Sequence, residues 1–170
     1  MFDRLAEKPD DMHPHAQLIA QFYTAFGKRD AEAMAACYHA DVVFSDEVFP
    51  RLEGARASDM WRMLLSRSTD LHIDFSGVAA DDASGRAHWD ARYTFTKTGR
   101  PVLNQVDATF EFRDGKIARH IDRFDFWRWS RQALGPVGLL LGFTPLLRKA
   151  VRRQAADQLE AWLARRSGAG

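Results

Sequence analysis

His120 and Asp122 stand two positions apart in the alternating segment RHIDRFDFWRW (119–129), so in a β-strand their side chains point to the same face. Asp46 and Asp90 stand in other strand-like segments. If these carboxyl groups meet in an apolar cavity, burial disfavours their ionised forms, and close neighbours lose their protons at different pH values. One group then donates a proton while another accepts one, and His120, which titrates near neutrality, shuttles or orients that proton. Such a site suits enolisation, aldol cyclisation, dehydration or attack of water on an activated ring.

The strand that carries His120 and Asp122 belongs to a predicted hairpin. Asp114-Gly115 is typical of a two-residue type I′ turn that joins strands over 102–113 and 116–126. That turn pairs Arg113 with Lys116, and it places His120 and Asp122 on a polar face with Gln105, Asp107 and Thr109. The other face then carries Val106, Ala108, Phe110, Phe112, Ile117 and Ile121.

The facing of this hairpin decides the role of both residues, and two arrangements stay open. If helices cover the apolar face, the polar face is solvent or dimer surface, and His120 and Asp122 are structural. If the polar face lines a cavity, a partner subunit must bury the apolar face. A β-bulge would change the facing in either case, because it inserts one unpaired residue.

The other segments predict an α+β order. Apolar residues at helical spacing predict helices over 14–27, 31–38 and 57–66, and period-two segments predict strands over 42–46, 71–79, 86–97, 102–113 and 116–126. Asp30 is expected to cap the second helix and Asp125 the segment that begins FWRW. The order predicts a roll in which three N-terminal helices cover one face of a curved antiparallel sheet.

Length and composition limit the classes of protein. The chain has 170 residues, enough for one domain, and its 46% apolar and 28% charged residues are typical of a globular protein. Its one cysteine, Cys37, excludes an internal disulfide and a zinc site built from cysteines. We expect residues 1–13 to be disordered. Because they lack the apolar core of a signal peptide, we expect a cytoplasmic protein.

The C-terminal part is basic and partly apolar. Residues 127–170 contain eight Lys and Arg against two Asp and Glu, a net charge of +6, whereas the rest of the chain carries −5. The apolar stretch 135–143 is far shorter than the ~20 residues that span a bilayer. Pro145 begins a last helix, whose apolar stripe is formed by Leu147, Val151, Ala155, Leu159 and Trp162. We expect this helix to be a lid or a dimer contact rather than a membrane-surface helix, and we expect no nucleic-acid binding, since no reading motif accompanies the charge.

Three stretches resemble one family. HADVVFSD (39–46), TGRPV (98–102) and RDGKIARHIDRFD (113–125), together with the element order, resemble the nuclear-transport-factor-two-like superfamily over residues 14–126. That superfamily includes SnoaL-like polyketide cyclases, ketosteroid isomerases, limonene epoxide hydrolase and scytalone dehydratase. The resemblance implies a cone, in which a bent sheet wraps around helices and a deep apolar pocket opens at one end. It also implies a homodimer through the sheet. Residues 127–170 lie outside the resemblance and are expected to form a C-terminal helical extension.

Ketosteroid isomerases suggest three of the site residues. Their general-base aspartate falls at Asp46, and their oxyanion-hole aspartate falls at or beside Asp107. Their oxyanion tyrosine falls near Phe22, beside Tyr23, so this chain has phenylalanine at that place.

Limonene epoxide hydrolase suggests further site residues. Its Arg-x-Asp step matches His88-Trp89-Asp90, with histidine in place of arginine, and its final-strand aspartate matches Asp122. Its water-positioning tyrosine and asparagine correspond to Phe44 and Asp46.

Together these residues predict a protein that binds a small hydrophobic molecule. We expect acid–base catalysis without metal or other cofactor by Asp46, Asp90, His120 and Asp122. We expect Phe22, Tyr23, Phe44, Trp61, His88 and Asp107 to contact the ligand. A metal site made of His88, His120 and Asp122 is an alternative, and a ligand-binding or dimerisation module without catalysis is another.

Overall fold

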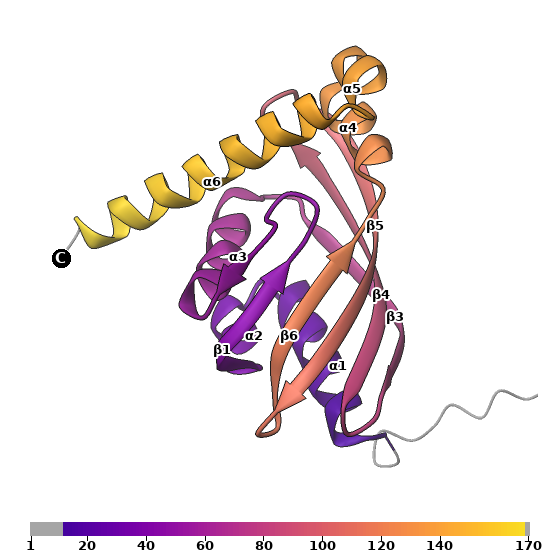
Figure 1. Cartoon of the computed structure of the whole chain (residues 1–170), viewed down its shortest axis with the longest axis vertical. Helices are drawn as coiled ribbons and strands as arrows, with labels where there is room; N and C mark the ends of the chain where they lie inside the picture. Colours follow the sequence, from indigo (N-terminus) through magenta and orange to yellow (C-terminus); the bar gives the residue numbers. More distant parts are fainter. Residues whose placement is uncertain (1–11, 169–170) are drawn as a thin grey trace, which may run out of the picture.

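The chain forms a curled sheet wrapped around helices (Figure 1). The computed structural model describes residues 12–168, so most of the segment predicted to be disordered lies outside the described residues. The elements are α1 (Pro14–Gly27), α2 (Ala31–Ala36), β1 (Tyr38–Ser45), β2 (Leu52–Glu53), α3 (Ala55–Arg67), β3 (His72–Ala80), β4 (Ser84–Phe95), β5 (Arg100–Arg113), β6 (Lys116–Arg123), α4 (Phe126–Leu134), α5 (Pro136–Leu141) and α6 (Pro145–Ser167).

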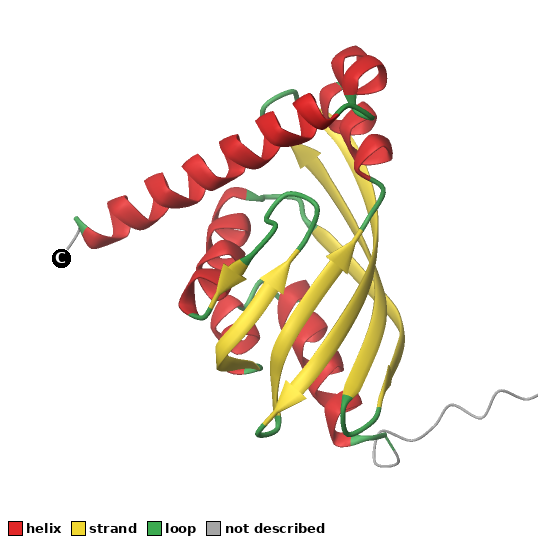
Figure 2. Cartoon of the chain, in the orientation of Figure 1, coloured by secondary structure: helices red, strands yellow, loops and turns green. Residues whose placement is uncertain are grey.

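The six strands form one sheet in the order β2-β1-β6-β5-β4-β3. All neighbouring strands are antiparallel except β1 and β6, which run parallel. In Figure 2 the long strands bend around α1, and α2 and α3 lie beside it. The predicted α+β class, with a curled and mostly antiparallel sheet, is confirmed.

Side-chain caps begin the helices where the sequence predicts them. The Asp30 carboxylate accepts a hydrogen bond from the Ala33 backbone N–H at 2.9 Å. Asp125 does the same for Arg128 at 3.0 Å. Both bonds satisfy N–H groups that the first turn of a helix leaves without partners. The element bounds differ by a few residues from those predicted, and the predicted second helix ends at Ala36 because Tyr38 already belongs to β1.

The core lies between the inner face of the sheet and α1 and α3. Ile19 and Phe22 on α1 have no exposed surface, and Met60 and Trp61 on α3 are almost as deeply buried. Alternate residues of β4 and β5 complete it, namely Ala87, Trp89, Ala91, Val106, Ala108 and Phe110. Because strand side chains alternate between faces, the residues between these positions point outward.

A β-bulge at Ala118 corrects the predicted hairpin register. Arg113 pairs with Lys116, as the turn predicts, but beyond the next pair Glu111 lies opposite Arg119. Ala118 is therefore an extra residue on β6, and a regular hairpin cannot reproduce the pairing after it.

The bulge brings His120 and Asp122 to the inside of the cone. They lie opposite Phe110 and Ala108, and not opposite Thr109 and Asp107 as the regular register predicts. His120 has no exposed surface and Asp122 only 3%. The inner face is therefore apolar and still carries these two polar groups.

The C-terminal helices close one end of the cone. α6 crosses over α3 (Figure 1), and its Leu159 is buried in the main core. Polar contacts fix the crossing: Arg67 donates a hydrogen bond to Gln158 at 3.0 Å, and Arg148 forms an ion pair with Glu47 at 2.8 Å. Within residues 12–168, no helix is both long enough and apolar enough to cross a membrane.

Candidate functional site

Inside the cone, an apolar cavity of about 160 Å³ is bordered by two carboxyl groups. Asp46, which follows the end of β1, and Asp122 on β6 both line it. The remaining wall is apolar or weakly polar and consists of Phe26, Val48, Phe49, Trp61, Leu64, Ser68, Leu71, Trp89, Ala91, Tyr93, Asn104, Val106, Phe124 and Trp129. The structure therefore brings together two of the four residues predicted to be catalytic.

A chain of buried hydrogen bonds ends at Asp122. The Trp61 indole N–H donates to the Tyr38 hydroxyl oxygen at 2.9 Å. That hydroxyl lies 2.8 Å from Nδ1 of His120, and Nε2 of His120 lies 2.9 Å from Oδ1 of Asp122. The Trp89 indole N–H donates to the same Oδ1 at 3.3 Å.

The order of donors in this chain assigns the tautomer of His120. The Tyr38 oxygen already accepts the Trp61 proton, so its own proton is available for Nδ1 of His120. With Nδ1 as acceptor, the neutral imidazole carries its proton on Nε2 and donates it to Asp122. Each donor then meets one acceptor. Asp122 is held in orientation by an imidazole that does not itself line the cavity.

The second oxygen of Asp122 has no partner. Oδ1 receives two N–H donors, whereas Oδ2 is buried and makes no hydrogen bond with any of residues 12–168. A buried oxygen without a partner is costly and is seldom kept in a folded protein. Since Asp122 lines the cavity, Oδ2 is the acceptor that this residue has left for a ligand.

Asp46 follows the end of β1 that is away from Tyr38, and backbone N–H groups hold its carboxylate. Its Oδ1 accepts hydrogen bonds from the N–H groups of Val48, at 2.7 Å, and Phe49. Burial raises the pKa of Asp46 from 3.8 to about 7, and the negative charge of Asp122 raises it further, while the two backbone donors oppose the rise. The residue keeps partial exposure because it borders the cavity. Asp46 is thus poised between its protonated and ionised forms near neutral pH.

Aromatic rings surround His120 on its other sides. The rings of Phe44 and Phe110 lie 5.1 and 4.5 Å from the imidazole, and that of Phe22 lies at 5.4 Å. Phe22, Tyr23 and Phe44 are buried in the core and do not line the cavity, so their contact with a ligand stays a prediction. Of the predicted ligand contacts, Trp61 lines the cavity.

His88, Asp90 and Asp107 form a separate group on the outer face of the sheet. Nδ1 of His88 lies 2.8 Å from Asp107, and Nε2 lies 3.1 Å from Asp90. The two carboxylates raise the pKa of His88, the hydrogen bond to Asp107 most of all. The structure does not bring Asp90 together with Asp122, and none of His88, Asp90 and Asp107 lines the inner cavity. Their catalytic and ligand-binding roles stay predictions. On β4 it is Trp89 and Ala91 that face inward.

This separation also means that His88, His120 and Asp122 do not form the alternative metal site. His88 lies on the opposite face of the sheet from His120 and Asp122. Among residues 12–168, no three His, Cys, Asp or Glu side chains form a group that could hold a metal ion.

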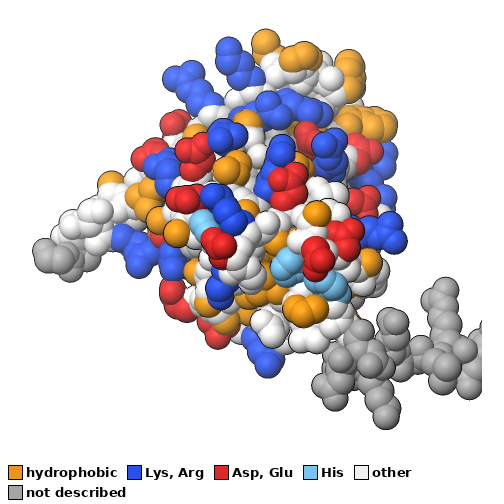
Figure 3. Space-filling model, turned by 60° about the horizontal axis from the view of Figure 1, so that its bottom comes forward, with side chains coloured by type: hydrophobic (Ala, Val, Ile, Leu, Met, Phe, Trp, Pro, Cys, Tyr) orange, Lys and Arg blue, Asp and Glu red, His pale blue; other side chains and the backbone are white. Residues whose placement is uncertain are grey.

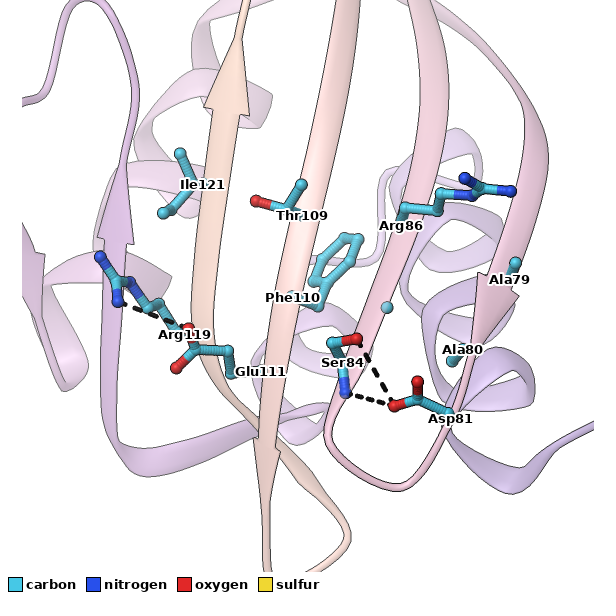
Figure 4. A pocket seen from close by; sticks show the side chains of 11 residues that line it. Ala79, Ala80, Asp81, Ser84, Arg86, Thr109, Phe110, Glu111, Arg119 and Ile121 are labelled. Carbon is cyan, nitrogen blue, oxygen red and sulfur yellow. Dashed lines mark hydrogen bonds and ion pairs between the residues drawn. The ribbon is translucent and has the colours of Figure 1, made fainter.

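A more open hollow of about 550 Å³ lies on the outer face of the sheet (Figure 4). Its charged side chains belong to solvent-exposed residues, and two of them, Arg119 and Glu111, pair with each other at 3.4 Å. This hollow lacks the desolvated titratable groups of the inner cavity, so acid–base chemistry points to the inner one. A homodimer through this outer face stays a prediction.

Sequence reasoning missed Tyr38 and Trp89 as partners of the site. The sequence places Tyr38 at the end of a predicted helix, whereas in the structure it begins β1 and pairs with Ile117 of β6. The alternation of β4 places Trp89 on the same face as Ala91 and Tyr93, and a tryptophan on this more apolar face is the signal that could have identified it as a buried donor.

Comparison with known proteins gives the same fold. Residues 19–120 match the model of the SnoaL-like domain. A candidate polyketide cyclase from Xanthomonas campestris is 24% identical, with a TM-score of 0.62 over 71% of this chain and 96% of that one. An epoxide hydrolase from M. tuberculosis that resembles limonene epoxide hydrolase is 22% identical, with a TM-score of 0.60 over 75% and 96%.

A third solved structure shares the architecture at still lower identity. It is a protein with a ketosteroid isomerase-like fold from Catenulispora acidiphila, 11% identical, with a TM-score of 0.61 over 71% of this chain and 94% of that one. At these identities the likeness shows the fold alone. No curated protein matches the chain in sequence.

Proposed function

The chain belongs to the SnoaL-like domain family, whose model it matches over residues 19–120, and we propose that it is an acid–base enzyme acting on a compact hydrophobic molecule. The observation that carries this proposal is the pair of unlike carboxyl groups on one apolar cavity. Asp122 offers an oxygen without a partner, and Asp46 has a pKa of about 7. A carboxyl group whose pKa is perturbed toward neutrality, next to a second carboxyl group in a cavity, is typical of acid–base sites.

In this proposal Asp122 is the general base. As the carboxylate, it takes a proton from a C–H group beside a carbonyl, or from a water molecule, through Oδ2. His120 and Trp89 keep Oδ1 occupied, so the reacting oxygen is fixed in place. His120 acts as a positioning residue, since it touches Asp122 and not the cavity.

Asp46 is the general acid. Its protonated form donates a proton to the substrate oxygen on which negative charge develops. Asp122 thus removes one proton while Asp46 supplies another at a different position. A group with a pKa near the working pH is suited to this task, because it is protonated often enough and releases its proton readily. Isomerisation, cyclisation, dehydration and ring hydrolysis all need this exchange.

The cavity limits the size of the reacting part. A dry cavity of about 150 Å³ holds a molecule of the size of benzene, so about 160 Å³ accepts one ring. A second hollow of about 190 Å³ between α3 and α6 shares Val48, Leu64, Ser68, Tyr93 and Trp129 with the cavity. A substrate with one reactive ring and an apolar tail fits this pair of spaces.

Four model compounds test the proposal: an epoxide, a β,γ-unsaturated ketone, a β-hydroxy ketone and a linear polyketone, each incubated with wild type, Asp122→Asn and Asp107→Asn. We expect wild type to convert at least one of them and Asp122→Asn to lose about a hundredfold or more of kcat. Asp107→Asn makes the same chemical change on the outer face and should keep the wild-type rate. An Asp122→Asn variant as active as wild type would refute the assignment.

The second candidate is a ligand-binding module of the same fold without turnover. It is favoured by the partner-free Oδ2, which a bound hydroxyl group would satisfy equally well. Binding of the four compounds by isothermal calorimetry, together with no turnover of any of them, would support this candidate over the enzyme.

A further inference from the structure

α5 presents large apolar side chains to solvent. Six residues in and after this helix are between 49% and 82% exposed: Val137, Leu139, Leu140, Leu141, Phe143 and Leu146. We call these six residues the α5 patch. A soluble monomer seldom leaves so many large apolar side chains together on its surface, and such patches mark sites of interaction.

Glycines hold this helix in its orientation. A Cβ atom at Gly138 would lie 1.9 Å from the Ser130 carbonyl oxygen, and one at Gly142 would lie 2.1 Å from Oγ of Ser130. The Trp127 indole N–H donates to the carbonyl of Leu139 at 3.2 Å. Only glycine allows α5 to pack this closely on α4, so its large side chains are directed outward by the packing.

α6 behaves in the opposite way. The predicted apolar stripe of α6 packs against the rest of the protein, since Leu159 is buried and Ala155 and Trp162 pack against the main core. Val151 packs against the smaller cluster around Trp129. The α5 patch is therefore the apolar surface that the C-terminal helices leave uncovered, and the amphipathic stripe of α6 is not.

Basic residues flank the α5 patch in the sequence. Residues 126–156 contain six Lys and Arg and no Asp or Glu. Arg148 and Arg152 contact Glu47, but Arg128, Lys149 and Arg153 are exposed and make no ion pair within the described part of the chain. In Figure 3 hydrophobic side chains gather at the top, at the end of the molecule where α5 lies in Figure 1, with Lys and Arg beside them.

We propose that the α5 patch docks onto an anionic lipid bilayer, with its apolar side chains in the interfacial region and the neighbouring Lys and Arg on the headgroups. Apolar residues flanked by basic ones are the composition of segments that lie on membranes. Trp127, which is partly exposed beside the patch, is a residue type enriched at the bilayer interface. A second copy fits less well, because a two-fold contact would place the same basic ring against itself.

Docking in this manner would also bring the cavity toward the bilayer. α4, on which α5 packs, supplies Trp129 to the wall of the inner cavity and of the hollow beneath α6. An apolar compound dissolved in the membrane would then have a short path to the site. The docking itself does not depend on catalysis, so the two proposals fail separately.

Vesicle co-sedimentation tests the docking with the full chain. Wild type is mixed with vesicles of phosphatidylcholine alone, or of phosphatidylcholine with phosphatidylglycerol, at low and high salt. The test variant carries Leu140→Glu, Phe143→Glu and Leu146→Glu. The matched control carries Gln21→Glu, Thr24→Glu and Gln105→Glu, which change the net charge equally at exposed positions outside the patch.

We expect wild type and the control to bind the anionic vesicles and the test variant to bind at least tenfold more weakly. Each basic residue near an anionic surface contributes about fivefold in affinity, so high salt should weaken wild-type binding strongly. Equal binding by the test variant and the control would overturn the proposal. A wild type that ignores the vesicles and forms a dimer, lost in the test variant by analytical ultracentrifugation, would overturn it in favour of a second copy.

Discussion

Replacing Asp46 by asparagine should stabilise the protein at high pH and leave it unchanged at low pH. Asparagine keeps the shape and the Oδ1 acceptor for the Val48 and Phe49 N–H groups, but it cannot ionise. The pKa of Asp46 rises from 3.8 to about 7 on folding, chiefly because the carboxyl group is buried. Between these values the folded state holds a proton that the unfolded state releases.

The sign of the effect follows from proton linkage. Because Asp46 binds more protons in the folded state in this interval, its contribution to the free energy of unfolding falls as pH rises from about 4 to about 7. A pKa that moves from 3.8 to about 7 corresponds to at most about 4 kcal/mol. Wild type therefore carries this cost above about pH 7, and Asp46→Asn does not.

Urea denaturation at a series of pH values between about 4 and 8 measures the difference. Subtracting the wild-type curve from that of Asp46→Asn removes every other titrating group from the comparison. Asp41→Asn, at an exposed position on β1, is the control and should run parallel to wild type. If the Asp46→Asn and wild-type curves are also parallel, Asp46 is not desolvated and is not the acid of the site.

Two further outcomes test neighbouring contacts. Asp122→Asn should lower the pKa of Asp46 below about 7, because it removes a negative charge that opposes ionisation of Asp46. ¹³C NMR of the Asp46 carboxyl carbon measures this pKa. An unchanged pKa would show that the two carboxyl groups do not interact. Leu159→Ala should lower the free energy of unfolding by about 2–5 kcal/mol, because the Leu159 side chain is buried in the core. The control Leu146→Ala, at an exposed position of the same helix, should lower it by less than about 0.5 kcal/mol. Equal losses in the two variants would contradict the packing of α6.

The architecture could be predicted from local signals. Asp30 and Asp125 predict the starts of two helices, and the Asp114-Gly115 turn predicts a hairpin. The alternation of residue types in β4 predicts which side chains share a face of the sheet. Each of these signals depends only on residues a few positions apart, so it can be recognised in the sequence without knowledge of the tertiary structure. The facing of Trp89 and Asp90 could be predicted in the same way, and only the resemblance to epoxide hydrolase favoured Asp90 as a cavity residue.

The facing of His120 and Asp122 could not be predicted from local signals. It depends on the bulge at Ala118, and neither alanine nor its neighbours Ile117 and Arg119 favour a bulge by their type. The bulge is decided by pairing on both sides, since β6 lies between β5 and β1. The link from Tyr38 to His120 spans 82 positions in the sequence, which no periodicity can reveal.

The position of Leu159 has a consequence for how the protein is made. This side chain belongs to the same core as Ile19 and Phe22, which are synthesised well before it because they belong to α1, whereas Leu159 belongs to α6. A ribosome must therefore release the chain through Leu159 before this core is complete, and the growing polypeptide leaves the face of α3 that meets α6 uncovered until then. Nascent chains of this protein should need protection by a chaperone late in translation, and premature stops before residue 159 should yield molecules that aggregate.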